Sequence, residues 1–207
     1  MTERTITVTG RGALLLAPDL VRLTLSVSKA HSDFAQAVRA AEEGGARVKE
    51  ALEKSGAAQV KAAGVRTEPL YETVTENGTS VRRQTGYTAT RRLRAELSAD
   101  PALLAQVLAA LADSGASPAL SAEYTLADAD KAKRHAAALA VKDAKKRAEA
   151  IAKAAGVKLG GVRTVQSGQH GAFPAVRAMA MRANDLSDLS PEELEITEEL
   201  TLTFDIG

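Results

Sequence analysis

The sequence predicts an α+β fold, in which an antiparallel sheet with a ferredoxin-like βαββαβ unit is accompanied by one long alanine-rich helix and C-terminal strands. Three observations support this class. Residues 19–30 alternate apolar and polar side chains, Asn77-Gly78 is a strong two-residue hairpin signal, and residues 128–156 carry an alanine-rich helical pattern. From residue 19 onward the segments follow the order β-α-β-β-α-β, which is that of a split βαβ unit.

Two strands are expected at the N-terminal end. In residues 4–16 the apolar-polar alternation stops at Gly10 and Gly12, and we interpret this interruption as a β-bulge. A proline turn leads into the strand of residues 19–30, so the two strands are expected to form a hairpin. The Gly-x-Gly pattern does not indicate a phosphate-binding loop, because no helix follows it.

Two shorter helices have clear N-terminal signals. Asp33 or Ser32 is placed to cap the first helix, which ends at a Ser-Gly pair. Asp100 is placed to cap the second helix, with Pro101 at its first position. Residues 118–127 supply the strand that follows.

A long hairpin lies between these helices, with extended runs at 59–76 and 79–97. Extrapolation from the turn places Glu72 opposite Arg83. The register is expected to slip near Pro69 and Gly86, because proline cannot donate to a ladder and glycine often marks a bulge.

The long helix has signals at both ends. Asp128 is a good N-cap, so the helix should begin at Ala129, and Gly156 suits the left-handed residue beyond its end. Apolar side chains at intervals of three and four residues form one stripe, which is expected to be buried. This stripe consists of Ala137, Val141, Ala144, Ala148, Ile151 and Ala155. The basic exterior is interpreted as a solvated face, or alternatively as a docking surface for an acidic partner or for the acidic C-terminal strand of a second copy.

The same region contains the pattern A-x-x-D-A-x-x-x-A-x-x-x-A-x-x-x-G-x-x-L-G. Its residues are Ala140, Asp143, Ala144, Ala148, Ala152, Gly156, Leu159 and Gly160. This pattern resembles the signature helix of the SIMPL-domain (YggE-like) family. The opening Gly-x-Gly, Thr67, Tyr71, the Gly86-Tyr87 pair and the alternating final strand also resemble that family, so the resemblance covers nearly the whole chain.

The resemblance implies one SIMPL-type domain over residues 1–207. Residues 4–125 would supply a β-β-α-β-β-α-β part, and residues 126–207 the long helix, a loop and the closing strands. The resemblance further implies a bacterial origin, a loosely defined role in envelope or oxidative-stress physiology, and self-association. It brings no catalytic residues to carry over.

The composition excludes several classes of protein. The chain has 207 residues with 45% hydrophobic and 26% charged content and a formal net charge of +1, so no global field attracts it to nucleic acid. It contains no cysteine, which excludes disulfides, thiolate catalysis and Cys-ligated zinc. No apolar run is long enough for a membrane span, and the chain enters a strand without an export-signal segment. We therefore expect a cytoplasmic protein, or a periplasmic one if an export signal was trimmed.

Residues 168–191 form the one long segment without a regular pattern. Phe173, Val176, Met179 and Met181 make it more apolar than a solvated loop requires, so these four residues are the candidates for self-association. A disordered loop is the alternative. Residues 192–206 then alternate again and are expected to close the sheet.

No reaction centre is predicted. His31, His135 and His170 lie far apart without metal-ligand spacing, and no Gly-x-Ser-x-Gly motif marks a serine nucleophile. We therefore expect surface histidines, no metal and no cofactor.

The densest basic cluster contains Arg82, Arg83, Arg91, Arg92 and Arg94. Arg91 falls on the apolar-facing side of its strand, and the other four are the candidate contacts for a polyanion. Nucleic acid is less favoured, because only Tyr87 offers a stacking aromatic nearby. The preferred interpretation is cross-strand pairing of the arginines with Glu68, Glu72 and Glu96.

Together these patterns predict a non-enzymatic protein that forms a homo-oligomer. Association would use exposed strand edges, the Phe173–Met181 segment, and opposite charge on the long helix and the terminal strand. Two alternatives remain: a module that binds polyanions or nucleic acid, and an enzyme with an unrecognised pocket between helix and sheet. The sequence identifies no small-molecule ligand.

Overall fold

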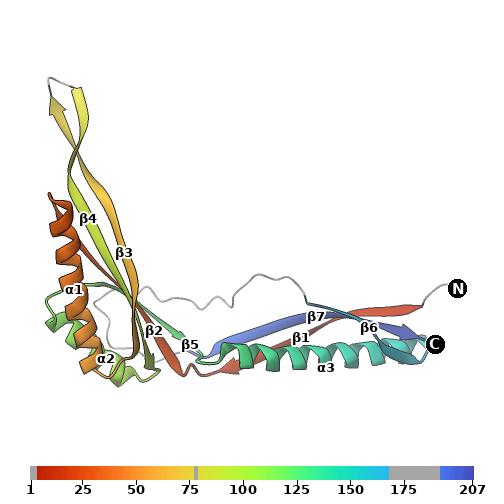
Figure 1. Ribbon diagram of the computed structural model, residues 1–207. Coiled ribbons are helices and arrows are strands. Elements are labelled where there is room, and N and C mark those ends of the chain that lie inside the picture. Colours follow the sequence, from red (N-terminus) through yellow and green to blue (C-terminus); the bar gives the residue numbers. More distant parts are fainter. Residues whose placement is uncertain (1–3, 77–78, 168–191) are drawn as a thin grey trace. The chain divides into compact units, whose positions relative to one another are not determined.

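The computed structural model describes residues 4–76, 79–167 and 192–207. The chain divides into two compact units. The first contains the residues up to Pro18 and the described residues from Thr125 onward, and the second contains Asp19–Tyr124. Each unit has an antiparallel sheet with helices, as Figure 1 shows, and this confirms the predicted α+β class.

The second unit has the predicted ferredoxin-like order. Its elements are β2 (Leu20–His31), α1 (Phe34–Lys54), β3 (Ala58–Glu76), β4 (Thr79–Ser98), α2 (Pro101–Asp113) and β5 (Ala119–Thr125). The sheet order is β3-β4-β2-β5. One face of β2 and β4 packs against the two helices in a core that includes Val21, Leu23, Leu25, Val27, Leu93, Val48, Leu52, Leu104 and Val107. The other face of this sheet is covered by neither α1 nor α2, and we call it the uncovered face.

The helices begin where the capping residues predict. The Asp33 carboxylate accepts from the Gln36 N–H at 2.9 Å, and the Asp100 carboxylate accepts from the Ala102 N–H at 2.8 Å. These contacts satisfy backbone donors that have no partner within the helix.

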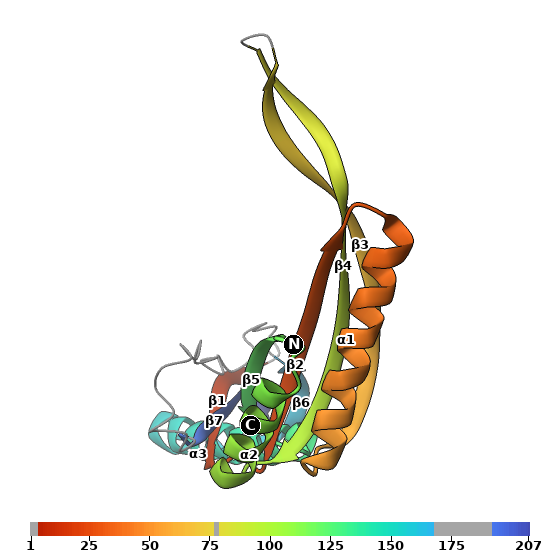
Figure 2. The same ribbon diagram turned by 90° about the vertical axis from the view of Figure 1, so that its left-hand side faces the viewer.

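The β3–β4 hairpin extends beyond α1 and beyond the end of β2 (Figures 1 and 2). The pairing of β2 with β4 stops at His31↔Tyr87, whereas β3 and β4 remain paired to the turn. We call residues 71–76 and 79–84 the arm.

The register of the arm agrees with the prediction. Glu72 lies opposite Arg83, and the register shifts between Leu70 and Tyr71, close to the predicted slip. Thr85 is the residue that this shift leaves without a cross-strand partner.

The first unit contains β1 (Thr5–Leu16), α3 (Ala129–Ala155), β6 (Leu159–Ser167) and β7 (Leu194–Ile206). Its sheet order is β1-β7-β6. The predicted hairpin between residues 4–16 and 19–30 is therefore wrong, since β1 pairs with β7 and β2 pairs with β4. The last strand also belongs to this separate sheet and does not close the ferredoxin-like one.

The physical reason lies in the partners that β1 can bury. Ile6 and Val8 pack with Leu202 and Phe204 of β7 in a cluster with the alanines of α3. A short turn brings two strands close, but the burial of matching apolar faces decides which strands pair.

The predicted bulge at Gly10 and Gly12 is also wrong. The β1–β7 register runs without a shift from Thr5↔Asp205 to Leu16↔Leu194. Both glycines continue the buried face of β1. The backbone of α3 lies so close to them that a larger residue would not fit. A Cβ added at Gly10 would lie 2.5 Å from Ala144 N, closer than real Cβ atoms approach other atoms.

The buried face of α3 differs from the predicted stripe. It consists of Ala132, Ala136, Ala140, Ala144, Ala148 and Ala152. Val141 and Ile151 are 39% and 47% exposed, so their predicted burial is wrong. Each alanine of this face is displaced by about 40° around the helix axis from the alanine four residues before it. The buried face therefore winds around the helix, which suits packing on strands that are themselves twisted. Side-chain size selects the face, because only methyl groups fit between the helix and the sheet.

Asp143 links α3 to β1. Its carboxylate accepts a hydrogen bond from the Arg11 N–H at 3.0 Å and forms an ion pair with Arg147 at 2.9 Å. The hydrogen bond from Arg11 and then the one from Arg147 lower the pKa of the Asp143 carboxyl.

This lowered pKa predicts a dependence of stability on pH. The ionised carboxylate stabilises the folded state above its ordinary pKa of about 3.9, and the contribution is lost as the pH falls through the lowered pKa. Asp143→Asn should therefore unfold at a lower temperature near neutral pH and should lose less stability on acidification. Thermal unfolding followed over pH tests this, with Glu149→Gln on the same helix as the control. Parallel curves for Asp143→Asn and the unmodified chain would contradict the assignment.

Candidate functional site

The candidate self-association residues Phe173, Val176, Met179 and Met181 lie outside the described residues. The described surface has two other regions of note. One is the arm, and the other is the uncovered face of the four-stranded sheet.

Arg92 and Arg94 lie together on the uncovered face. Leu93, between them, is buried in the core with α1 and α2, so its two neighbours project to the other side of the sheet. Arg94 is paired with Thr24 and Arg92 with Ser26, which places two hydroxyl groups beside the two guanidinium groups.

Arg82 and Arg83 are not part of this group. Both lie on the arm, beyond the point where β2 ends. The Arg82 guanidinium lies over the Tyr71 ring at 4.2 Å from its centre, a cation–π contact. The structure therefore brings together two of the four candidate polyanion contacts and separates them from the other two.

Among the described residues, the clustered arginines form none of the expected ion pairs with Glu68, Glu72 and Glu96, so that prediction is wrong. Glu96 pairs with Arg22 of β2 at 3.6 Å, and Glu68 pairs with Arg66 of its own strand at 2.6 Å. Within the described parts of the chain, neither Arg92 nor Arg94 forms an ion pair.

Arg91 lies on the helix-covered side, as its position in the strand predicts. It forms an ion pair with Glu42 of α1 at 3.3 Å. Its side chain passes over Gly45, where an added Cβ would lie 2.6 Å from Arg91 Cγ. This arginine is a structural contact between sheet and helix.

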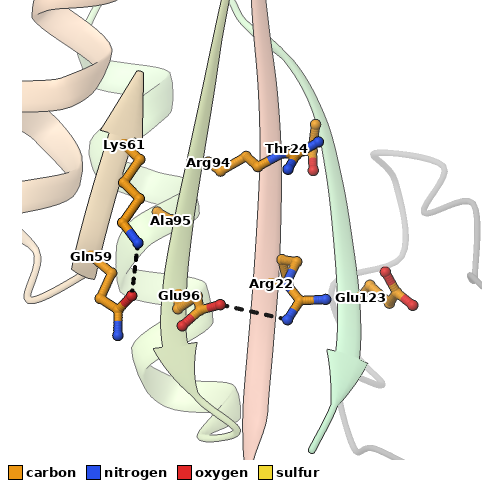
Figure 3. Close-up of a pocket in the computed structure, with 8 residues that line it drawn as sticks. All are labelled: Arg22, Thr24, Gln59, Lys61, Arg94, Ala95, Glu96 and Glu123. Atoms are coloured by element: carbon orange, nitrogen blue, oxygen red, sulfur yellow. Dashed lines mark hydrogen bonds and ion pairs between the residues drawn. The ribbon is translucent and has the colours of Figure 1, made fainter. Parts of the chain in front are cut away.

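Two adjoining depressions mark the uncovered face. The first, shown in Figure 3, has a volume of about 490 Å³ and is lined by Arg22, Thr24, Gln59, Lys61, Arg94, Ala95, Glu96 and Glu123. The second has a volume of about 310 Å³ and is lined by Thr24, Ser26, Ala63, Arg92, Leu93 and Arg94. They share Thr24 and Arg94, so they form one continuous strip along β2 and β4.

Sequence reasoning missed several residues of this strip, among them Arg22, Gln59 and Lys61. Arg22 could have been found, because it alternates with the buried Val21 and Leu23 on β2. Gln59 and Lys61 could not, because the β3–β4 register shifts on both sides of Lys61 and Ala62, and this breaks the alternation.

The arm exposes apolar side chains. Tyr71 and Val81 are each 41% exposed, and Leu70 at the base of the arm is 39% exposed. In the described residues the two strands of the arm pair only with each other. The arm thus combines apolar surface with strand edges that have no neighbour.

Charge on the three-stranded sheet is partly balanced within that sheet. Glu195 of β7 pairs with Arg11 of β1 at 3.4 Å, and Asp205 of β7 pairs with Arg163 of β6 at 3.9 Å. Two acids of the terminal strand thus already have basic partners, which weakens the hypothesis that this strand attracts the basic helix of a second copy.

The described histidines are surface residues. His31 is exposed, and its Nδ1 accepts from the Asp33 N–H at 2.9 Å. His135 is exposed on α3, and His170 lies outside the described residues. In the part of the chain that the structure describes, no three His, Cys, Asp or Glu side chains are grouped as metal ligands would be. The described helices include none with the length and apolar character needed to cross a bilayer.

Similarities to solved structures are weak. A Bacillus cereus protein related to NIF3 is 16% identical with a TM-score of 0.32, over 56% of this chain and 29% of the other. CutA from Synechococcus elongatus is 17% identical with a TM-score of 0.22, over 55% of this chain and 83% of the other. The regulatory subunit of aspartate kinase from Thermus flavus is 10% identical with a TM-score of 0.21, over 93% and 86%. TM-scores of this size do not establish a shared fold.

Sequence relatives give a clearer answer. No curated protein matches the chain. The SIMPL family, described as "Protein of unknown function (DUF541)", matches residues 6–204. This match spans nearly the whole chain and includes the Gly-x-Gly of β1, the alanine face of α3 and Asp143, which together hold the helix on its sheet. The chain therefore belongs to the SIMPL family, whose molecular role is undefined.

Proposed function

We propose that this chain is a non-catalytic assembly module that self-associates through the arm. The observation that carries the proposal is the two-stranded arm itself, which extends beyond the sheet and exposes Tyr71 and Val81. A two-stranded ribbon is only marginally stable in water, and its edges present unpaired N–H and C=O groups to another strand. A second arm would pair these groups and would cover part of the exposed Tyr71 side chain.

Charge favours β3 as the edge that pairs with a second copy. In a two-fold antiparallel pairing of β3 with β3, centred on Thr73, Tyr71 faces Thr75 and Glu72 faces Val74, with no like charges opposed. The corresponding pairing of two β4 edges is centred on Arg82, the cross-strand partner of Thr73, and would oppose the Arg82 side chains of the two copies. Like charges directly opposed across strands are destabilising.

The absence of cysteine from the chain permits a direct test. Thr73→Cys places one thiol at the proposed two-fold axis, where directly opposed residues of antiparallel strands have Cα atoms about 4.5–5.5 Å apart. This separation suits a disulfide. Mild oxidation should therefore convert this variant to a covalent dimer, measured on a non-reducing gel.

Ser80→Cys is the matched control, because Ser80 is an exposed residue of the β4 strand of the same arm. In the proposed dimer the two β4 strands are three strand spacings apart, about 14 Å, beyond the reach of a disulfide. Equal cross-linking of both variants would indicate random collision, and preferential cross-linking of Ser80→Cys would place the interface on β4. Either result, or no covalent dimer at all, overturns the proposed interface.

A further inference from the structure

The uncovered face of the second unit carries an excess of positive charge. Four cations line the two adjoining depressions: Arg22, Lys61, Arg92 and Arg94. The carboxylates of the same depressions are those of Glu96 and Glu123, and Glu96 is already paired with Arg22. This leaves Lys61, Arg92 and Arg94 as the cations that could hold an anion.

The arrangement of these cations is unfavourable without a counter-ion. Lys61 lies directly opposite Arg94 in the β3–β4 register. Like charges directly opposed in a sheet are destabilising. The Lys61 ammonium group donates to the Gln59 side-chain oxygen at 3.3 Å, a neutral acceptor. An anion bound between Lys61 and Arg94 would turn this repulsion into two attractions.

The backbone beside Lys61 is irregular. Gln59 has a φ of 51°, in the left-handed region that few non-glycine residues adopt, and the register shifts between Ala58 and Lys61 and again between Ala62 and Val65. Figure 3 shows the Gln59 and Lys61 side chains beside Glu96 on the uncovered face. Bulges and strained residues are frequent at binding sites, where they aim side chains at a ligand.

The shape of the strip suits a chain of anions. Arg92 and Arg94 alternate on one strand, which places their Cα atoms about 7 Å apart. The hydroxyl groups of Thr24 and Ser26 lie on the neighbouring strand and can donate to oxyanions in either depression. Both depressions are lined without aromatic side chains, so the strip offers no platform on which bases could stack.

We propose that the uncovered face binds a linear phosphate chain, of the class of inorganic polyphosphate. Lys61 and Arg94 hold one phosphoryl group between them, and Arg92 holds a group further along the chain. Arginine is suited to this role because its guanidinium group binds phosphate oxygens in pairs. The site is independent of the arm and does not require self-association.

Binding of inorganic polyphosphate to the full-length chain tests the proposal, with the affinity measured at several salt concentrations. The affinity should fall as salt rises, because bound counter-ions are released. Arg94→Gln should weaken binding by about tenfold or more, the value of a charge-assisted hydrogen bond. The thermal stability of Arg94→Gln should be unchanged or higher, because the substitution removes the repulsion with Lys61.

Lys145→Gln is the matched control, because Lys145 is exposed within the basic exterior of α3. The affinity of the Lys145→Gln variant for polyphosphate should remain within about twofold of that of the unmodified chain, because an exposed charge pair contributes little binding free energy. An equal loss in both variants would show unspecific attraction to positive charge and would overturn the proposal. An absence of polyphosphate binding at low salt would also overturn it.

Two further probes distinguish a polyphosphate site from a site for free phosphate and from a site for nucleic acid. Orthophosphate should bind much more weakly than polyphosphate, because it contacts only one part of the strip. Oligothymidylate of equal charge should bind more weakly than polyphosphate, since the strip cannot stack its bases. Tighter binding of the oligonucleotide, lost in Arg94→Gln, would identify a nucleic-acid site and would replace the proposal.

Discussion

Gly10→Ala is expected to lower the free energy of unfolding of the unit formed by β1, α3, β6 and β7 by about 3 kcal/mol or more. The added Cβ would lie 2.5 Å from Ala144 N and 2.7 Å from Ala144 Cβ. The first of these is a backbone atom of a regular helix, so no side-chain rotation relieves the clash. The helix must move away from the sheet, and the alanine face then loses its contacts with β1 and β7.

Gly161→Ala is the control for this substitution. Gly161 lies in β6 of the same sheet, is exposed, and has no atom within 4 Å of an added Cβ. We expect it to change the free energy of unfolding by less than about 0.5 kcal/mol. Chemical denaturation of both variants measures the difference. Equal stability of the two would show that helix and sheet are not in backbone contact.

Ala144→Leu has the second largest expected effect, a loss of about 2 kcal/mol. Ala144 is fully buried between α3 and the strands, in one cluster with Ile6 and Leu202. Three additional carbon atoms have no space there and would force the helix outward. Thermal unfolding measures the loss.

Ala138→Leu provides the matched control on the exposed side of the same helix. It adds the same atoms to solvent-facing surface, where leucine and alanine have similar helix propensity. A loss for Ala138→Leu as large as that for Ala144→Leu would mean that the wrong face of α3 is assigned as buried.

Local signals predicted the elements of this fold well. Asp33, Asp100 and Asp128 cap their helices as expected, and Gly156 adopts the left-handed conformation beyond the end of α3 with a φ of 69°. The Asn77-Gly78 signal predicted the register Glu72↔Arg83. Each of these features depends on contacts between residues that are close in the sequence, so a short stretch of sequence is enough to predict it.

Long-range partners were predicted less well. The pairing of β1 with β7 joins segments about 190 residues apart, and nothing near residues 4–16 indicates it. Gly10 and Gly12 resembled a bulge because glycine supplies no apolar signal, although both positions are buried. The burial of Ala140 instead of Val141 follows from the close approach of the helix backbone to those glycines, which a hydrophobicity pattern does not report.

The same difference between local signals and long-range contacts applies to the candidate surfaces. Regular alternation placed Arg92 and Arg94 on one side of β4 and Arg91 on the other. The separation of Arg82 and Arg83 depends on where β2 ends, and the position of Lys61 depends on two register shifts. These are tertiary features, and no local signal in the sequence specifies them.

Self-association through the arm is most directly tested by the native mass of the unmodified chain, measured by light scattering from low to tens of micromolar protein. The account predicts a mass that rises with concentration from that of one 21.6 kDa chain to at least twice that value. A mass of one chain throughout the range would contradict it.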